Sequence, residues 1–513
     1  MKRLIVARKV VQGSFLALFI YILWSTTYPL TGAVPADTFF VTDPLIMLLT
    51  SLARRLVLPG IAVSLLLVAA GAVIGRFFCG WVCPLGTCID IAGSFGRKRT
   101  LADGRNAKLR RIKYLVLGLL VIFAAAGLQL AWVVDPQVIM ARFVSLNLIP
   151  TTTLLINGLF SWTIRIFRLY GPVYDLYRSL RMSFLGVKAY YFTHALFIFM
   201  LFAGIMYAAW ELRRWWCRVL CPLGALYALA ARTAFLERRV QPCKACKKCV
   251  SDCRMGAIRR DISYVKSECI LCMDCVYDCP QQATTFSFVK QRPKPSGNGI
   301  TRRDFLKLAA VSVVPALGFP AAVRTAGRAK VIRPPAALEE DEFVDRCVRC
   351  GNCMKVCITN GLQPAMFESG MTGIWTPRLV PEIGYCEYRC TLCGNVCPTG
   401  ALPRLTPREK RLTRLGIAKI NRSICLPWKE KKTCLVCEEH CPIPNKAIRF
   451  KKQDINGTMI ARPYIRPELC IGCGICQTKC PTRPERSIKV YPVKVTHADA
   501  NGKVKKETLA RGR

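Results

Sequence analysis

Long uncharged stretches alternate with short basic ones along the first half of the chain. Four of the uncharged stretches contain about 20 residues, the helical length that crosses roughly 30 Å of hydrocarbon. The pattern therefore predicts an α-helical membrane domain over residues 1–235, a four-helix arrangement of two related hairpins. The four predicted spans are residues 13–32, 56–75, 114–134 and 189–210.

A fifth uncharged stretch, residues 143–164, is interrupted by Asn147, Pro150, Asn157 and four threonines. Whether it spans decides the side of the membrane on which every later residue lies. Residues 76–113 carry nine Lys or Arg and two Asp. The excess of positive charge places this connection in the cytoplasm.

Residues 301–307 match the twin-arginine export pattern, with Arg302 and Arg303 ahead of an apolar run at 308–323. That signal is read from the cytoplasm, so an even number of spans must precede it if the basic N-terminus is also inside. Four spans meet this condition, and we therefore expect residues 143–164 to be interfacial or re-entrant. Alternatively, the arginines are a basic anchor beside a fifth helix, which leaves the topology almost unchanged.

Of the 29 cysteines, 24 fall into six tetrads. The first two have the C-x2-C-x2-C-x3-C spacing of bacterial ferredoxins, in which the fourth cysteine ligates the other of two [4Fe–4S] clusters. Zinc sites more often show paired C-x2-C spacings. The two expected ligand sets are Cys243, Cys246, Cys249 and Cys279, and Cys269, Cys272, Cys275 and Cys253.

Four further tetrads lie in the exported half, and two of them have irregular spacing at their first cysteine. Disulfides are the alternative in an oxidising periplasm. Export of an already folded domain favours four more [4Fe–4S] clusters, six in all. The tetrads are Cys347, Cys350, Cys353 and Cys357; Cys386, Cys390, Cys393 and Cys397; Cys425, Cys434, Cys437 and Cys441; and Cys470, Cys473, Cys476 and Cys480.

Four of the remaining cysteines belong to a repeat, C-x3-C-P-L-G, that follows the second and the fourth predicted span. Residues four apart on a helix share one face, so Cys79, Cys83, Cys217 and Cys221 could converge on one centre. They could hold another metal or cluster, or act as redox dithiols; simple packing is the alternative. Cys88 lies outside the repeat, and we expect it to be dispensable.

The formal net charge of +44 suggests nucleic acid, but no recognition module accompanies it. Anionic clusters and a positive-inside membrane topology account for much of the charge, and residues 491–513 form a basic tail. With three histidines and no C-x-x-C-H motif, membrane and c-type haems are disfavoured.

Residues 1–290 resemble the NapH-type membrane polyferredoxins of periplasmic nitrate reductase systems, which have four spans, two C-x3-C-P motifs and a two-cluster cytoplasmic domain. Residues 295–513 resemble the NapG-type ferredoxins, which have a twin-arginine signal and four periplasmic clusters. The resemblance implies a fusion of the two, a quinol dehydrogenase-type subunit that feeds a periplasmic redox protein or reductase. By analogy with four-cluster subunits, we expect the two outer exported motifs to exchange their last cysteines, and likewise the two inner ones.

The predicted protein is thus a multi-pass protein of the bacterial inner membrane. Its ferredoxin-like α+β domains lie on opposite sides, at residues 236–290 in the cytoplasm and 330–490 in the periplasm, with the export segment at 295–325 between them. A diffusible quinone is the simplest carrier between the two sides. Candidate residues for its proton chemistry are His194, Asp135 and Arg142, although a structural histidine and a helix-capping aspartate are the plainer interpretations.

Two other functions fit the same motifs. Electrons could pass from a cytoplasmic donor to quinone or outward, or the C-x3-C-P thiols could serve a metal-handling or maturation factor. The long exported ferredoxin argues against the maturation factor, which has no need of such a chain of clusters.

The predicted topology can be tested at the twin-arginine motif. Replacing Arg302→Lys and Arg303→Lys together should trap residues 330–513 in the cytoplasm, because the export receptor reads the arginine pair. Protease protection of spheroplasts would reveal the trapped domain. Unchanged export would mean that the two arginines are only an anchor.

Overall fold

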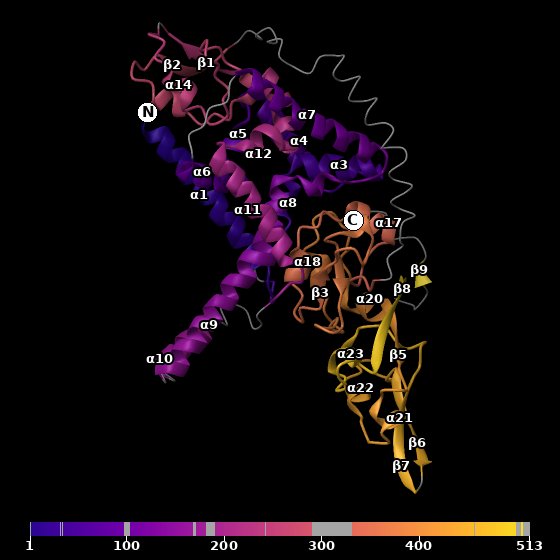
Figure 1. Cartoon of the computed structure of the whole chain (residues 1–513). Helices are drawn as coiled ribbons and strands as arrows, with labels where there is room; N and C mark the ends of the chain where they lie inside the picture. Colours follow the sequence, from indigo (N-terminus) through magenta and orange to yellow (C-terminus); the bar gives the residue numbers. More distant parts are fainter. Residues whose placement is uncertain are drawn as a thin grey trace. The chain divides into compact units, whose positions relative to one another are not determined.

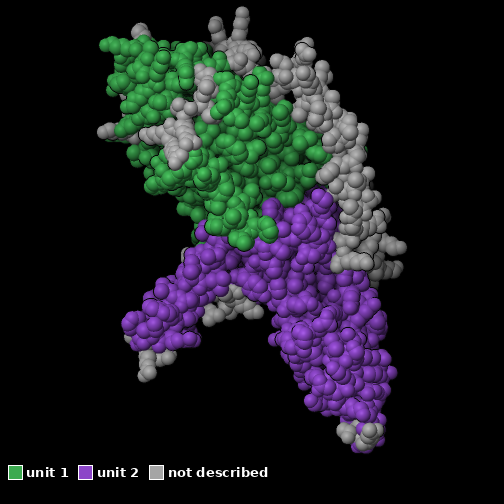
Figure 2. All heavy atoms as spheres, in the orientation of Figure 1, with its two compact units in different colours: residues 1–24, 37–144, 196–322 green, residues 25–36, 145–195, 323–513 purple. Residues whose placement is uncertain are grey.

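The computed structural model describes residues 2–30, 32, 34–96, 103–167, 171–180, 190–241, 243–289, 331–455, 457–498 and 504–505. The twin-arginine motif, the apolar run after it and most of the basic tail lie outside these residues. The chain forms two compact units, coloured separately in Figure 2. Unit 1 contains residues 1–24, 37–144 and 196–322, and unit 2 contains residues 25–36, 145–195 and 323–513.

Unit 1 is mainly helical (Figure 1), and proline sets the start of four of its helices. A proline in the first turn has its fixed φ preorganised for a helix, and the residue before it caps the free N–H groups. Asp43, Cys83, Asp135 and Cys221 are these caps. The helices are α1 (Lys2–Ser25), α2 (Thr38–Val41), α3 (Pro44–Arg54), α4 (Ile61–Ile74), α5 (Phe77–Trp81), α6 (Pro84–Phe95), α7 (Asp103–Ala125), α8 (Pro136–Phe143), α11 (Ala195–Glu211), α12 (Trp215–Val219) and α13 (Pro222–Ala230), with short 3₁₀ turns at Ala131–Val133 and Ala231–Thr233.

Two helices in the described part of the chain are long and apolar enough to cross a membrane, Arg3–Ser25 and Pro136–Phe167. The second contains the stretch at 143–164. There α8, a π-helical turn at Val144–Leu148 and α9 (Ile149–Phe167) form one continuous helix that is long enough to span, and the expectation of an interfacial or re-entrant position stays a prediction. Helices α3, α4 and α11 are apolar but shorter. The stretch predicted at 114–134 is α-helical only as far as Ala125.

The first two cysteine tetrads of unit 1 lie between two strands, β1 (Leu236–Val240) and β2 (Thr284–Phe288), which pair in antiparallel register. Short helical turns carry the tetrads: α14 (Lys248–Ser251), a 3₁₀ turn at Lys266–Glu268, and α15 (Asp274–Tyr277). Antiparallel pairing of the first and last segments closes the domain and brings both motifs into one small body.

A buried ion-pair group attaches this ferredoxin segment to the helices of unit 1. Glu268 lies 3.0 Å from Arg76 and also contacts Lys113. Burial alone opposes ionisation of the carboxyl, but Lys113 and Arg76 bring the pKa of Glu268 down to about 2. The carboxylate therefore stays charged at physiological pH, and the contact depends on all three side chains.

Unit 2 contains α9, α10 (Pro172–Leu180) and the second ferredoxin region, in which short helical turns alternate with small antiparallel sheets. Strands β3 and β4 form one pair, β6 and β7 form a hairpin, and β5, β8 and β9 form a three-stranded sheet. The elements are α17 (Glu340–Arg346), α18 (Asn352–Lys355), β3 (Leu362–Pro364), a 3₁₀ turn at Met371–Gly373, β4 (Pro377–Leu379), α19 (Leu392–Asn395), α20 (Pro407–Leu412), β5 (Arg414–Ile420), α21 (Leu426–Lys429), α22 (Val436–Glu439), β6 (Ile448–Ile455), β7 (Thr458–Ile465), α23 (Ile475–Lys479), β8 (Ile488–Ala498) and β9 (Val504–Lys505).

Within unit 2 the ferredoxin region packs against segments from the first half of the chain. The Nζ of Lys355 donates to the carbonyl of Thr26 at 3.1 Å, and the side chain of Asn360 donates to the carbonyl of Tyr191 at 2.9 Å. Leu146 lies against Gly351. Segments distant in sequence therefore hold the first cysteine motif of unit 2.

Gly80 permits a close approach between α5 and the ferredoxin segment of unit 1. A Cβ at this position would lie 2.1 Å from the carbonyl oxygen of Ile270, far inside contact distance. We predict that Gly80→Ala destabilises unit 1 by about 1–3 kcal/mol, the usual cost of overpacking. Thermal unfolding would measure it. Gly104→Ala is the matched control, because a Cβ at this exposed position of α7 meets nothing within 4 Å, and it should be neutral or stabilising.

Candidate metal centres

The four regularly spaced tetrads share an unusual backbone conformation. In each C-x2-C-x2-C loop, the residues immediately before and after the second cysteine have positive φ. This conformation costs a non-glycine residue about 1–2 kcal/mol. Its recurrence in all four loops indicates that each loop curves around a bound group of the same shape. The residues are Ala245, Lys247, Leu271, Met273, Arg349, Gly351, Gly472 and Gly474.

A single helical turn begins near the third cysteine of every tetrad. Cys249 lies in α14, Cys275 in α15 and Cys353 in α18, and the other three motifs follow the same rule with α19, α22 and α23. The turn carries the fourth cysteine away from the loop that holds the first three. The fourth sulfur is therefore available to a neighbouring site.

In unit 1 the cysteines gather in the two sets expected from the sequence. Cys249 interacts electrostatically with Cys243, Cys246 and Cys279, which together form site E. Cys272 and Cys275 both interact with Cys269 and with Cys253, which together form site F. This grouping of the thiols is the one that the predicted exchange of fourth cysteines requires, and the exchange as cluster ligation stays a prediction.

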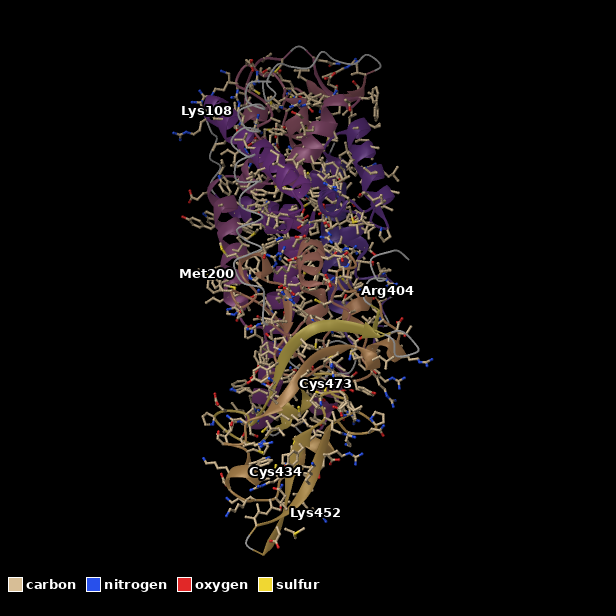
Figure 3. All side chains as sticks on the ribbon, turned by 90° about the vertical axis from the view of Figure 1, so that its right-hand side faces the viewer. Lys108, Met200, Arg404, Cys434, Lys452 and Cys473 are labelled. Carbon is tan, nitrogen blue, oxygen red and sulfur yellow. The ribbon has the colours of Figure 1, made fainter. Side chains whose placement is uncertain are left out.

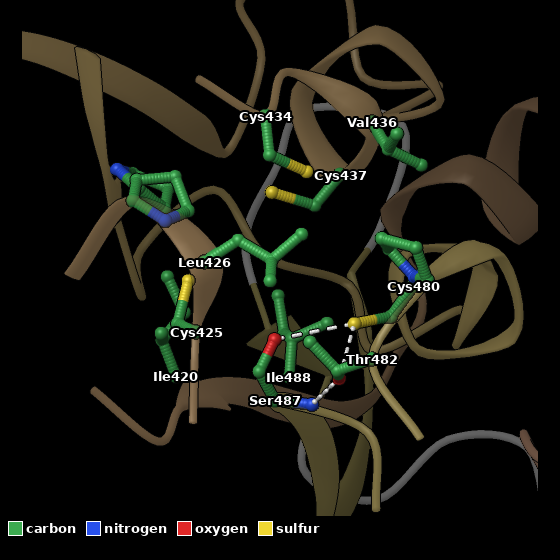
Figure 4. A pocket seen from close by; sticks show the side chains of 13 residues that line it. Ile420, Cys425, Leu426, Cys434, Val436, Cys437, Cys480, Thr482, Ser487 and Ile488 are labelled. Atoms are coloured by element: carbon green, nitrogen blue, oxygen red, sulfur yellow. Dashed lines mark hydrogen bonds between the residues drawn. The ribbon is translucent and has the colours of Figure 1, made fainter. Parts of the chain in front are cut away.

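In unit 2 the other 16 cysteines surround four cavities, with four cysteines at each. The cavities are similar in size, about 330 to 410 Å³ including their open mouths, as expected if all four accept the same group. Figure 4 shows the one at Cys425. Site A has Cys347, Cys350, Cys353 and Cys397; site B has Cys386, Cys390, Cys393 and Cys357; site C has Cys425, Cys434, Cys437 and Cys480; site D has Cys470, Cys473, Cys476 and Cys441.

The expectation that outer motifs exchange with outer and inner with inner is wrong. Each motif exchanges its last cysteine with its neighbour in sequence: Cys397 lies at site A, and Cys357 at site B. The reason is local. Strands β3 and β4 lie between the motifs of sites A and B, and the β6–β7 hairpin lies between those of sites C and D. Each antiparallel pair folds its two flanking motifs back toward each other.

The four sites of unit 2 follow one another in the order A, B, D, C. Cys353 of site A interacts electrostatically with Cys393 of site B. The backbone N–H of Cys386 at site B donates to the carbonyl of Cys473 at site D, at 2.8 Å. Cys476 of site D interacts with Cys437 of site C. In Figure 3, Cys473 and Cys434 mark the last two sites.

Polar groups near the sulfurs suit anionic thiolate ligands. Backbone N–H groups donate to the sulfurs of Cys253, Cys397 and Cys470 at 3.1–3.4 Å. Buried Lys410 interacts with Cys386 and Cys473, at sites B and D. Both features stabilise negative charge on sulfur. The donor set therefore fits [4Fe–4S] clusters. Sequence reasoning missed Lys410, which lies far in sequence from both of these cysteines.

The four C-x3-C-P thiols lie near one another inside unit 1, and a centre shared by all four stays a prediction. Cys221 interacts electrostatically with Cys217, Cys79 and Cys83, and all four are buried. Burial raises the pKa of Cys83, Cys217 and Cys221, so cations must replace the thiol protons if the sulfurs are to act as thiolates.

The expected single helix through each of these motifs is wrong. Cys79 lies in α5, whereas Cys83 caps α6 and accepts the Gly86 N–H at 3.4 Å. Cys221 caps α13 in the same way, at 3.2 Å from the Gly224 nitrogen. The proline after the second cysteine starts a new helix, and the thiols converge through the turn.

The three candidate residues for proton chemistry lie at different places. Asp135 caps α8 by accepting the backbone N–H groups of Gln137 and Val138, and Arg142 stacks over the ring of Trp132. Both belong to unit 1. His194 belongs to unit 2, immediately before α11 rather than within a helix, and interacts with Glu368.

Buried Asp43 is a partner of Asp135 that the sequence analysis did not single out. The two buried carboxyls interact, although each caps its own helix. Burial together with the neighbouring carboxyl raises the pKa of Asp43, which favours a proton on one of the pair. Each of the two aspartates directly precedes a proline that starts a helix, and this shared sequence feature could have identified the pair.

Two family models match parts of the chain. Residues 56–101 and 192–242 match a 4Fe-4S binding domain, and these segments include both C-x3-C-P motifs. Residues 432–483 match a 4Fe-4S dicluster domain. No solved structure matches the chain.

Several ferredoxin-type proteins align with about 200 residues. The methylamine utilization ferredoxin-type protein MauM of Methylorubrum extorquens is 36% identical over 202 residues, which are 37% of this chain and 89% of MauM. The ferredoxin-type protein NapG of Escherichia coli is 33% identical over 211 residues, which are 39% of this chain and 88% of NapG. At these identities, and with most of each relative covered, the chain belongs to the family of ferredoxin-type iron–sulfur proteins that includes MauM and NapG.

Proposed function

We propose that this chain is a NapH–NapG fusion that oxidises quinol in the bacterial inner membrane and passes the electrons through [4Fe–4S] clusters to a periplasmic redox partner. Its two candidate spans and shorter apolar helices support a membrane location. The main observation behind the proposal is the unbroken order of sites A, B, D and C, which suits stepwise electron transfer. Clusters at sites A–F would supply the one-electron steps, and the cysteines and their N–H donors would hold them.

Site C is the last site of this series, so electrons would leave the chain from there. It lies beside β6 and β7, where basic side chains are exposed: Lys451, Lys452 and Arg449, with Arg422 and Lys429 nearby. We call these five residues the basic tip. Trp428 packs between Arg422 and Arg462, beside the Pro427 that lines site C. A concentration of positive charge next to the last site favours an acidic redox partner.

A menaquinol analogue tests the function directly. Added anaerobically to the purified oxidised chain, it should bleach the visible absorption of the clusters, because quinol supplies two electrons to one-electron centres. Dithionite gives the full extent of bleaching, and oxidised quinone is the control that should change nothing.

Two outcomes would favour the other functions. One outcome is that a low-potential ferredoxin reduces the clusters and the clusters then reduce quinone, whereas menaquinol does not reduce them. This outcome would support a cytoplasmic electron source. Absence of both reactions together with stoichiometric copper at the C-x3-C-P thiols would support a maturation factor.

The exit can be tested by reversing charge at the basic tip. Lys451→Glu with Lys452→Glu should slow electron transfer to an acidic one-electron acceptor protein severalfold and weaken its dependence on ionic strength. Stopped-flow kinetics at several salt concentrations would measure both effects.

The matched control is Arg404→Glu with Arg408→Glu, which reverses the same charge on another exposed part of unit 2. Figure 3 shows how far Arg404 lies from Lys452. Equal slowing by the two pairs would indicate a general charge effect and would exclude the tip as the exit.

A further inference from the structure

The sequence repeat around the C-x3-C-P motifs extends beyond the cysteines on the N-terminal side. Arg76 lies three residues before Cys79, and Arg214 lies three residues before Cys217, so the full repeat is R-x2-C-x3-C-P-L-G. Both arginines are buried, with exposures of 0% and 1%. Long cationic side chains are rarely buried without a partner of opposite charge.

Each arginine reaches across to the opposite repeat. Arg214 donates through Nη1 to the carbonyl of Cys79 at 2.8 Å, and through Nη2 toward that of Gly86. Arg76 Nη2 lies 2.8 Å from where a Cβ on Gly224 would be, beside Cys221. The two guanidinium groups also interact electrostatically with the thiols, Arg76 with Cys79 and Cys221, and Arg214 with Cys217 and Cys79.

Three N–H groups at this centre are buried and have no hydrogen-bond acceptor among the described residues. They are Nε and Nη2 of Arg76 and Nε1 of Trp216, which is adjacent to Cys217. Arg76 Nη1, by contrast, is bound to Glu268. A buried donor left without an acceptor costs about 1–3 kcal/mol, more when it is charged. The arrangement therefore calls for an acceptor that the protein itself does not supply.

The charges around the thiols leave a positive excess. Arg76 and Lys113 share one carboxylate, Glu268. Around Arg214, the cations outnumber the carboxylates by one: Arg8, Arg214 and Arg254 face Asp90 and Asp274. Arg110 also interacts with Glu268, so the described cations outnumber the described carboxylates in both networks. A [4Fe–4S] cluster with four thiolates carries a charge of about −2, which would offset part of this excess.

We propose that Cys79, Cys83, Cys217 and Cys221 bind a seventh [4Fe–4S] cluster, and that Arg76 and Arg214 balance its charge from opposite repeats. The helix starts at α6 and α13 direct further N–H groups at Cys83 and Cys221. This centre does not depend on the direction of electron flow. It deepens the proposed function by giving the helical part of unit 1 a redox centre of its own.

The centre lies against site F. Trp81, two residues after Cys79, donates its indole N–H to the carbonyl of Leu271 at 3.0 Å, within the loop between Cys269 and Cys272. Arg218, next to Cys217, donates to the side-chain oxygen of Asn106 at 2.6 Å, and its Nη2 lies 2.8 Å from where a Cβ on Gly256, three residues after Cys253, would be. The two repeats therefore hold site F from two sides, and the seventh cluster would exchange electrons with it.

Iron and sulfide analysis of the full chain, purified anaerobically, tests the site. Seven clusters give about 28 irons per chain, and Cys79→Ser with Cys221→Ser, one change in each repeat, should lower this to about 24. Cys88→Ser is the matched control and should keep about 28, because Cys88 lies outside the repeat. Native mass spectrometry would show the loss as one intact cluster.

The effect of the two arginines on the cluster can be measured separately, through its midpoint potential. Arg76→Gln with Arg214→Gln should move the midpoint potential of one cluster to a more negative value, since the reduced cluster carries more negative charge. Arg76→Lys with Arg214→Lys should restore part of the shift, and Arg213→Gln, next to Arg214, should leave every potential unchanged. Redox titration followed by electron paramagnetic resonance would measure this, even if the cysteine variants fold poorly.

Three results would overturn the proposal: about 24 irons in the unaltered chain with none lost in the cysteine variant, one zinc per chain lost in that variant, or a disulfide among the four cysteines. Each of these would leave the clusters at sites A–F, and their reduction by quinol, unaffected.

Discussion

A tight cysteine loop can place only three sulfurs around one cluster, and most of this chain is arranged to supply the fourth. A helical turn after the third cysteine carries the fourth toward a neighbouring site, so two motifs complete each other. The antiparallel pairs β3–β4 and β6–β7 lie between partner motifs and keep them close. Paired sites then become a series, because the N–H of Cys386 bonds to the carbonyl of Cys473 and joins one pair to the next.

Negative charge on buried sulfur creates a second requirement, for cations close by. In unit 2, Lys410 lies between two sites, and in unit 1 Arg76 and Arg214 cross between the repeats. Glu268 and Asp90 hold these arginines in place without neutralising them fully. Buried ion pairs of this kind add little stability by themselves. Their value here is a local positive field beside buried sulfurs.

The internal repeat connects these two requirements. Proline after the second cysteine starts a new helix, which directs N–H groups at the sulfur, and the glycine two residues later makes room for the opposite arginine. Gly80 then lets the same segment approach the loop of site F. A short sequence pattern thus positions ligands, charge and a neighbouring centre together.

The sequence by itself indicated the number of tetrads, the grouping of cysteines within the first pair and the proximity of the C-x3-C-P thiols, because spacing limits what a short loop can reach. Hydrophobic pattern alone suggested an interruption at residues 143–164, but threonine is compatible with a long helix when its hydroxyl bonds to the backbone of the preceding turn, as those of Thr152 and Thr153 do. The partner of each cysteine motif in unit 2, the role of Lys410 and the crossing of the two arginines were decided only by the tertiary structure. These features join residues far apart in sequence, and hairpin pairing and charge balance between such residues leave no local signal.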